Sequence, residues 1–423
     1  MSSFYDRTMT YDVAEVRSTF PALSRHEGGR QVAWLDGPAG TQVPGSVIDA
    51  IATLLRDGIS NHGGDFAASR DAAALTDGAR EAVADLLGAS PSEIVFGQNM
   101  TSLTFAMSRA IARDWQVGDR VVVTMLDHDA NVTPWREAAQ DKGAEIVSVE
   151  FDPATGLLDP EAVIAAINER TRLVAVTATS NALGSVTDLA PIVKAATDAG
   201  ALSYIDAVHF SAHRISNVGA LQPDFLVASA YKFFGPHTGV LYGRGEHLEQ
   251  LTPFKVHPAP DTAPDRWETG TQSFESLVAV TAAVDHLASL GRGESRRNRL
   301  ESAFAAIRVH EDALSTRFLA GLAEIPGVRL YGPPNAGDQR VSTFAVDVAG
   351  MHARRVAAEM GRRGIYVWDG HYYATGVMQH LGLLERGGLV RIGFVHYSTA
   401  GEVDRVLGVL EELSAGRTDW TEG

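Results

Sequence analysis

The stretch SAYKFFGPHTGVLYGR, residues 229–244, directly follows the apolar run DFLVA and contains a second β-type run, GVLYG. Between the two runs stands a lysine, Lys232, flanked by Tyr231, Phe233 and Phe234 and followed by a glycine-proline turn. The chain has only four lysines, and arginine supplies 32 of its 36 basic residues. Lys232 either lays its stem over apolar surface or is a desolvated, Schiff-base-forming nucleophile.

Before and within this stretch, short β-type runs alternate with helical segments from about residue 118 to residue 242. The runs are RVVVTML, EIVSVEF, RLVAVTA, ALSYID, DFLVAS and GVLYG. The helices are expected near residues 132–142, from Pro160 and over 189–199, with Asp159 as a cap before Pro160. Such alternation predicts an α/β fold with a mostly parallel sheet covered by helices.

Downstream, the pattern changes after RWETGTQS to two long helices, near residues 275–290 and 294–322. Further β-type runs, among them VSTFAVDV, GIYVW and LVRIGFVHYS, follow. We expect a large domain over residues 26–290 and a smaller α+β C-terminal domain over 291–423, against which the N-terminal segment 1–25 packs. The cleft between two such domains is a favoured ligand site.

Composition excludes several kinds of chemistry. The 423 residues carry a formal net charge of -16, which argues against nucleic acid or an anionic membrane as partner. No cysteine is present, so disulfides, thiolate metal sites and thiol nucleophiles are excluded. The fourteen histidines show no metal-ligand spacing, and we expect no metal. The first residues lack an apolar signal core, so a cytoplasmic protein is expected.

Polar residues follow each predicted strand at the point where it ends. The segments are DHDANVTPW, SNALGSV, DAVHF and AYKFFG. Ligands of open parallel sheets bind outside the carboxyl ends of the strands, so these segments define the candidate site. Asp206, which closes the run LSYI, either caps a turn or faces a heteroaromatic cation.

From VAWLDGPAGTQVP to LVRIGFVHYSTAGEVD, these motifs resemble the class V aminotransferases, and most closely the group II cysteine desulfurases. The resemblance implies the aspartate-aminotransferase-like fold, fold type I of the pyridoxal-phosphate enzymes. It further implies pyridoxal 5'-phosphate as cofactor, an amino-acid substrate and a homodimer with shared active sites. Lys232 would then carry the cofactor as a Schiff base.

The resemblance also assigns roles around the cofactor ring. His128 matches a histidine that stacks on the ring. Asp206 matches the acid that keeps the ring nitrogen protonated, which makes the ring an electron sink. His209 stands where the desulfurases have a glutamine near the ring hydroxyl.

At the phosphate and at the substrate, further positions match the family. Thr101, Ser229 and Tyr231 match phosphate contacts, and Thr271 matches a residue that reaches the phosphate from the partner subunit. For the substrate carboxylate, the matching residues are Asn181 and Arg391. A planar guanidinium suits a carboxylate because it donates two parallel hydrogen bonds.

The departures lie in YVWDGHYYA, residues 366–374, where the desulfurases carry an arginine and the catalytic cysteine. Trp368 replaces that arginine, and Tyr373 falls at or near the cysteine position. Trp368, Tyr372 and Tyr373 either shape a substrate pocket or form ordinary core. We expect β-elimination at a carbon–sulfur or other Cβ–heteroatom bond without persulfide formation. The alternatives are a class V aminotransferase, an amino-acid epimerase and a catalytically silent cofactor-binding relative.

Overall fold

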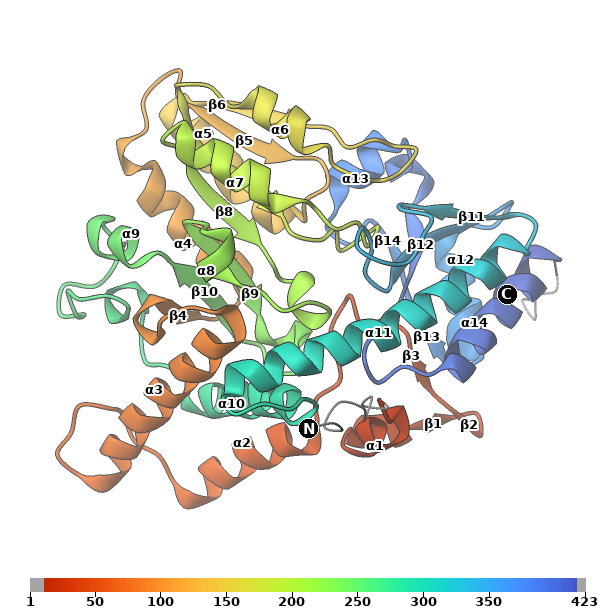
Figure 1. The fold of residues 1–423 in the computed structure, drawn as a ribbon, viewed down its shortest axis with the longest axis horizontal. Coiled ribbons are helices and arrows are strands. Elements are labelled where there is room, and N and C mark those ends of the chain that lie inside the picture. Colours follow the sequence, from red (N-terminus) through yellow and green to blue (C-terminus); the bar gives the residue numbers. More distant parts are fainter. Residues whose placement is uncertain (1–10, 417–423) are drawn as a thin grey trace, which may run out of the picture.

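The computed structural model describes residues 11–416 and confirms the predicted α/β fold (Figure 1). Its largest sheet has seven strands, and all run parallel except β10, which is antiparallel to both neighbours. In sheet order the strands are β4 (Ile94–Gly97), β10 (Gly239–Gly243), β9 (Phe225–Ser229), β8 (Leu202–Asp206), β7 (Thr171–Thr177), β5 (Arg120–Thr124) and β6 (Glu145–Val149).

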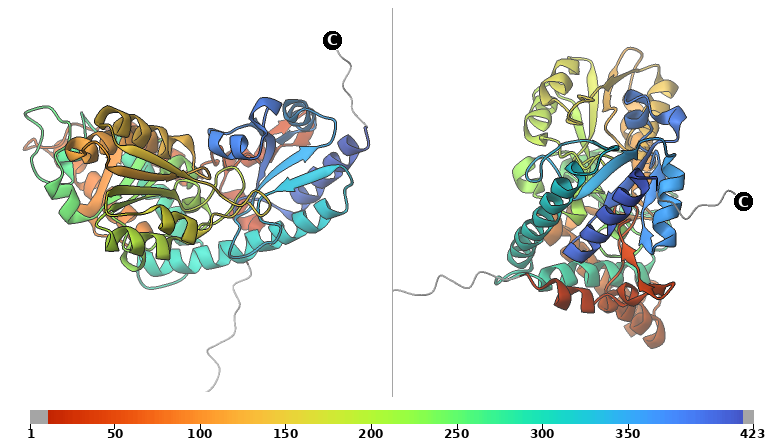
Figure 2. Two further views of the ribbon diagram at one scale, coloured as in Figure 1. Left: turned by 90° about the horizontal axis from the view of Figure 1, so that it is seen from above. Right: turned by 90° about the vertical axis from the view of Figure 1, so that its right-hand side faces the viewer.

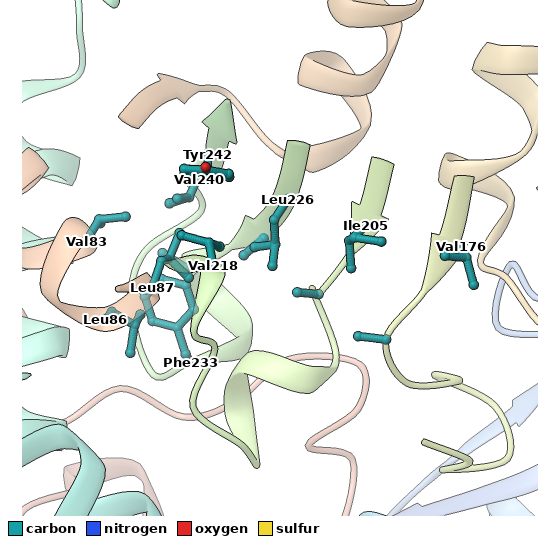
Figure 3. Packing of buried hydrophobic residues seen from close by; sticks show 14 of the residues in the cluster. Val83, Leu86, Leu87, Val176, Ile205, Val218, Leu226, Phe233, Val240 and Tyr242 are labelled. Atoms are coloured by element: carbon teal, nitrogen blue, oxygen red, sulfur yellow. The ribbon is translucent and has the colours of Figure 1, made fainter. Parts of the chain in front are cut away.

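Helices cover both faces of this sheet because its strands are apolar on both sides. In β9, Leu226 and Ala228 join one core cluster, while Phe225 and Val227 join another, as the two-residue period of a strand requires. The first cluster includes side chains of α3 (Ala67–Leu87), α7 (Leu189–Asp198) and α10 (Phe274–Ser289), and Figure 3 shows part of it. The second includes side chains of α4 (Met100–Ile111) and α5 (Thr133–Lys142).

Helix boundaries follow local sequence signals. The side chain of Asp159 accepts a hydrogen bond from the Glu161 backbone N–H at 3.0 Å, and α6 (Pro160–Ala166) begins with proline as expected. Helix α5 ends at Gly143, whose φ of 69° is readily adopted only by glycine. The other helices before α10 are α1 (Val13–Ser18), α2 (Gly45–Asp57), α8 (Val218–Leu221) and α9 (Gly245–Gln250).

A smaller, antiparallel sheet lies beside the first. Its four strands, in order, are β11 (Val328–Tyr331), β12 (Thr343–Val348), β15 (Leu389–Gly393) and β14 (Trp368–Gly370). The helices of this region are α12 (Ala353–Arg362), α13 (Thr375–His380) and α14 (Ala400–Ser414). The long helix α11 (Arg296–Ala323) runs along both parts of the molecule (Figure 2).

The predicted single strand GIYVW is two strands in different sheets. β13 (Ile365–Tyr366) pairs in parallel with β3 (Ala33–Trp34), whereas β14 begins at Trp368 and pairs with β15. The chain therefore changes sheets at Val367, which directs the following loop toward the large sheet. A short hairpin of β1 (His26–Glu27) and β2 (Arg30–Gln31) precedes β3.

Short 3-10 turns complete the secondary structure. They are η1 (Pro21–Ser24), η2 (Pro91–Glu93), η3 (Ala112–Asp114), η4 (Asp129–Asn131), η5 (Phe210–Ala212), η6 (Ala230–Lys232), η7 (Asp265–Trp267) and η8 (Leu384–Arg386). At the N-terminal end, Arg17 of α1 pairs with Glu402 of α14 at 3.0 Å. The domain boundaries at residues 25 and 290 stay a prediction.

Candidate active site

A cavity of about 900 Å³ opens at the carboxyl ends of β5, β7, β8 and β9, where an open parallel sheet binds its ligands. The predicted site residues that line it are Thr101, His128, Asn181, Asp206, His209, Ser229, Tyr231, Lys232, Trp368, Tyr373 and Arg391. Only Thr271 is not among the lining residues. It is exposed and lies three residues before α10.

Lys232 ends the turn η6 that follows β9, and its side chain is buried. Its Nζ donates hydrogen bonds to the carbonyl oxygens of Pro38 at 2.5 Å and Ala39 at 3.0 Å. Burial, aided by the positive charge of Arg391, lowers the pKa of Lys232 to about 7. The amine is therefore buried and partly neutral near neutral pH. The interpretation that Lys232 only lays its stem over apolar surface is wrong.

Asp206 ends β8 with its carboxyl group at the cavity. Its Oδ1 accepts a hydrogen bond from the Val208 backbone N–H at 2.9 Å, so the residue does cap a turn. Burial raises the pKa of Asp206 to about 6, although the charge of Lys232 opposes this shift. A buried carboxyl group of this kind is stabilised when a cationic N–H group binds next to it.

His128 begins the turn η4 after β5, and its ring forms another part of the cavity wall. Its Nδ1 accepts a hydrogen bond from the Ala130 backbone N–H at 3.0 Å. Burial, followed by the charges of Lys232 and Arg391, lowers the pKa of His128 to about 4. The ring is therefore neutral at pH 7, and because Nδ1 accepts a hydrogen bond, its proton is on Nε2. A neutral ring of this kind can stack on a flat ligand.

The first turn of α4 provides a cradle for an anion. Asn99 caps this helix, and the Met100 backbone N–H donates to Ser229 Oγ at 3.1 Å. Thr101 and Ser102 present hydroxyl groups at the same end, and helix N-termini attract phosphate through free N–H groups. Gly239 permits the close approach of the Asn99 backbone, since an added Cβ would lie 2.5 Å from its carbonyl carbon.

On the opposite side of the cavity, Arg391 extends from β15 and is buried. Its Nη1 donates to the Asn181 carbonyl oxygen at 3.0 Å, and its guanidinium lies 4.4 Å from the ring centroid of Tyr372. Burial lowers the pKa of Arg391 to about 10, which leaves it protonated at neutral pH. A buried guanidinium with free N–H groups is suited to a carboxylate.

Asn181 faces the cavity but is engaged by the loop beyond β14. Its Nδ2 donates to the Tyr372 carbonyl oxygen at 2.9 Å, while its buried Oδ1 has no hydrogen-bond partner within residues 11–416. One amide proton remains for a ligand.

Strand β14 and the loop after it contain Trp368, Tyr372 and Tyr373. Trp368 is 53% exposed and Tyr373 is 67% exposed, so the core interpretation is wrong for both. Tyr372 and Tyr373 adopt left-handed backbone conformations, with φ of 54° and 57°. Such conformations cost of order 1 kcal/mol each and need external support. The Asp129 backbone N–H, donating to the Tyr373 carbonyl oxygen at 2.7 Å, supplies part of it.

Other cavity residues were not predicted from the sequence. Phe105, Asp369 and His371 also line the space, as do the carbonyl-bearing Pro38 and Ala39. Outside the lining set, burial raises the pKa of Asp36 to about 6, although Arg391 and Lys232 oppose the shift. Asp36 lies in VAWLDGPAG, a segment quoted above as a family motif but not assigned a role.

The described part of the chain has neither a metal-binding cluster nor a membrane-spanning helix. Within residues 11–416, no group of three or more His, Cys, Asp or Glu side chains is arranged to hold a metal ion. Over the same residues, no helix has the length and apolar character needed to cross a membrane.

The cavity fits pyridoxal phosphate. A buried, partly neutral amine suits an aldehyde carbon, Asp206 suits a protonated ring nitrogen, and the start of α4 suits a phosphate group. Comparison with known proteins agrees. The family model of the aminotransferases of class V matches residues 33–406, and the chain belongs to this family. It is a pyridoxal-phosphate-dependent enzyme.

Among curated proteins, a cysteine desulfurase of Yersinia pestis (strain Pestoides F) is 32% identical over 421 residues, covering 96% of this chain and 99% of the relative. The uncharacterized protein MT3887 of Mycobacterium tuberculosis (strain CDC 1551 / Oshkosh) is 33% identical over 409 residues, which cover 96% of this chain and 100% of that relative.

Solved structures of cysteine desulfurases are also similar. CsdA of Escherichia coli has a TM-score of 0.84 and 27% identity, covering 97% of this chain and 100% of that chain. The enzyme of Thermococcus onnurineus NA1 has a TM-score of 0.86 and 29% identity, covering 97% and 99%.

Proposed function

We propose that this enzyme eliminates a substituent from Cβ of an amino acid and does not capture sulfur as a persulfide. The observation that carries the proposal is the absence of any cysteine in the 423 residues, combined with a cavity that keeps Lys232, Asp206 and Arg391. Persulfide formation needs a sulfur nucleophile, whereas cleavage at Cβ does not. The relatives named cysteine desulfurases make a carbon–sulfur bond the natural target.

In this proposal each residue has a definite task. Arg391 and Asn181 hold the α-carboxylate, and Asp206 and His128 hold the cofactor ring. When bound, pyridoxal phosphate supplies an electron-withdrawing ring that stabilises negative charge at Cα. Lys232, whose pKa of about 7 suits proton transfer in both directions near neutral pH, takes the proton from Cα.

The overall reaction balances without an oxidant or reductant. The substrate loses the Cα proton and the bond between Cβ and the leaving atom, which departs with the electron pair. Lys232 returns its proton to that atom. Addition of water to the remaining three-carbon unit then gives pyruvate and ammonium, so each turnover releases one leaving group, one pyruvate and one ammonium.

We further propose that the substituent on Cβ is bulky and uncharged. Trp368, Tyr373 and Phe105 add aromatic surface to the cavity lining, and Trp368 stands where the resemblance to the desulfurases implies an arginine. Aromatic surface favours apolar groups over anionic ones. A cysteine thioether with an aryl or alkyl group suits this wall better than free cysteine.

The subunit arrangement is part of the proposal. Thr271 is exposed and is not a lining residue of its own chain's cavity, as a residue that reaches a neighbouring site would be. We propose a homodimer in which Thr271 contacts the phosphate in the other subunit.

The test is a substrate screen on the cofactor-loaded enzyme. Cysteine, S-alkyl and S-aryl cysteines, alanine and aromatic amino acids are supplied, and pyruvate, ammonium, released thiol and α-epimer are quantified together. Equal amounts of thiol, pyruvate and ammonium are expected from a thioether. Keto acid without ammonium would instead establish an aminotransferase, and racemised substrate an epimerase.

A catalytically silent relative gives a different result. In that case none of the substrates would turn over, even though borohydride treatment fixed the cofactor to Lys232. The matched control is Lys232→Ala, in which borohydride should fix no cofactor at this position.

A further inference from the structure

One hydrogen bond joins the two sheets at the wall of the cavity. His209 follows β8 of the seven-stranded sheet, and Thr343 is the first residue of β12 in the four-stranded sheet. Nε2 of His209 lies 2.9 Å from Oγ1 of Thr343, and both residues are buried. His209 lines the cavity, so a residue of the smaller sheet touches a cavity side chain directly.

The position of Thr343 is fixed by its own backbone. Its N–H donates to the Val341 carbonyl oxygen at 2.7 Å, and its carbonyl oxygen accepts from Arg340 Nη1 at 2.5 Å. Gly184 packs against the same carbonyl, where an added Cβ would lie 2.3 Å from the oxygen. The hydroxyl group therefore meets His209 from a well-defined direction.

The number of protons on the His209 ring and on the Thr343 hydroxyl group determines which of the two is the donor. Burial, followed by His213, Lys232 and Arg391, lowers the pKa of His209 well below its usual value, so the ring is neutral and carries one proton. The fully buried Thr343 hydroxyl has no other hydrogen-bond partner within residues 11–416. If Nε2 donated to it, the hydroxyl proton would have no acceptor, and an unmade buried hydrogen bond is costly. The hydroxyl therefore donates to Nε2, and the ring proton resides on Nδ1.

A second contact holds the ring plane. The ring of His213 meets that of His209 edge to face, with centroids 4.9 Å apart and planes at 77°. His213 is itself held by Glu311 of α11, whose Oε2 lies 2.7 Å from His213 Nδ1. His209 is therefore held on one side by the hydroxyl of Thr343 and on another by His213.

We propose that Thr343 is a positioning residue that fixes His209 as the Nδ1–H tautomer, so that His209 donates a hydrogen bond to an acceptor oxygen in the cavity. The ring oxygen of pyridoxal phosphate has the chemistry of that acceptor. Nδ1 has no hydrogen-bond partner among the described residues, which leaves its proton for a ligand. Because the controlling hydroxyl belongs to the smaller sheet, the donor depends on how the two sheets are packed.

The direct test is the tautomer of His209 in the cofactor-loaded enzyme. Nitrogen-15 NMR of histidine-labelled protein separates protonated from unprotonated ring nitrogens, and His209→Gln assigns the signals. A protonated Nδ1 and a bare Nε2 are expected. The opposite pattern in the wild-type enzyme overturns the proposal without any Thr343 variant.

Variants of Thr343 test whether its hydroxyl group affects the binding of pyridoxal phosphate. Thr343→Val keeps the shape but removes the hydroxyl, and it should weaken pyridoxal phosphate binding roughly tenfold and shift the visible absorbance of the bound cofactor. Thr343→Ser should restore both. In a His209→Gln background, Thr343→Val should change cofactor affinity by less than about twofold, because the histidine ring that the Thr343 hydroxyl orients is no longer present. A tenfold loss in that background too, or no loss in the wild-type background, contradicts the proposed role.

Discussion

The guanidinium of Arg391 lies over the ring of Tyr372, 4.4 Å from its centroid, and the two residues are joined a second time through Asn181. The Asn181 carbonyl oxygen accepts from Arg391 at 3.0 Å, while the Asn181 amide donates to the Tyr372 carbonyl oxygen at 2.9 Å. This closed arrangement orients the arginine before any substrate binds. Preorganisation reduces the entropy lost when a carboxylate is bound.

The contact between the Arg391 guanidinium and the Tyr372 ring predicts different KM values for two substitutions at Tyr372. Tyr372→Leu removes the aromatic face under Arg391 and should raise KM about tenfold for carboxylate substrates, since a desolvated cation–π contact contributes up to about 2 kcal/mol. Tyr372→Phe keeps the face and loses only the hydroxyl that donates to the Leu389 carbonyl oxygen. Steady-state kinetics on the best substrate of the screen measures both. Equal KM values for the two variants would show that the ring face is unimportant.

Lys232 should react as an amine with a pKa near 7. Labelling of the cofactor-free protein by an amine-reactive reagent should rise as the pH passes about 7, because burial disfavours the charged form. Arg391→Gln should move this midpoint upward, since Arg391 is the second cause of the shift. Peptide mass spectrometry measures labelling site by site, with exposed Lys194 as the internal comparison. An unchanged midpoint in Arg391→Gln would contradict the assigned cause.

Asp206→Asn should separate cofactor binding from turnover. The amide keeps the shape and an acceptor for Val208 but cannot balance a cationic ring nitrogen, so turnover should fall roughly 100-fold or more. Borohydride should still fix the cofactor to Lys232. Asp224→Asn is the matched control, because Asp224 is equally buried but does not line the cavity. If Asp206→Asn turned over substrate at the wild-type rate, the role assigned to the Asp206 carboxylate would be wrong.

Thr271 allows a complementation test of shared sites. Thr271→Ala alone should weaken cofactor binding roughly tenfold through the lost phosphate contact. Mixed with Lys232→Ala subunits, it should form hybrid dimers in which one site has both intact residues. Activity in the mixture that exceeds the sum of the separate variants is the expected result. Additive activities at every mixing ratio would indicate that Thr271 serves no neighbouring site.

Asp127 predicts a loss of stability as the pH rises from about 4 to about 8. Its carboxyl group is buried among Thr124, Asn131 and Asp206, and burial raises its pKa from the usual 3.8 to about 8. The folded state therefore binds this proton more tightly than the unfolded state, so the resulting stability is fully present below pH 3.8, falls as the pH rises above that value, and is gone once the pH passes about 8. Between these two pKa values the loss approaches about 1.4 kcal/mol per pH unit, and above about 8 this group adds no further dependence on pH.

Asp127→Asn, which mimics the protonated form, should remove this dependence. The measurement is the free energy of unfolding in denaturant at about pH 5 and about pH 8 for both proteins. Parallel changes in the two would mean that Asp127 does not titrate in this range. Comparing the two proteins cancels other groups that titrate between these pH values.

The seven-stranded sheet and most of its site could be predicted from the sequence because the signals are local. Each strand is a short apolar run, and the residue after it is placed at the sheet end by the strand itself. Asp206 and Lys232 end on the cavity for this reason. The same local signals gave the helix that begins at Pro160 and the one that ends before Gly143.

What could not be predicted depends on contacts between distant segments. GIYVW was expected as one strand, because nothing in its pattern marks the change of sheet at Val367. The carbonyl groups of Pro38 and Ala39 that receive Lys232 lie almost two hundred residues away in the chain, and backbone acceptors leave no trace in side-chain patterns. Thr343 was likewise hidden within an ordinary apolar strand.

Two main-chain contacts help to hold the loop of residues 371–373. Asn181 and the Asp129 amide hold the carbonyl oxygens of Tyr372 and Tyr373, and neither contact depends on the side chain at position 373. A change of side chain at position 373 therefore leaves these two main-chain contacts in place, although it alters the contact of the Tyr373 ring with the His128 ring, whose centroids lie 5.7 Å apart. A single-base change from a tyrosine codon to a cysteine codon would place a thiol at a cavity-lining position without removing either main-chain contact.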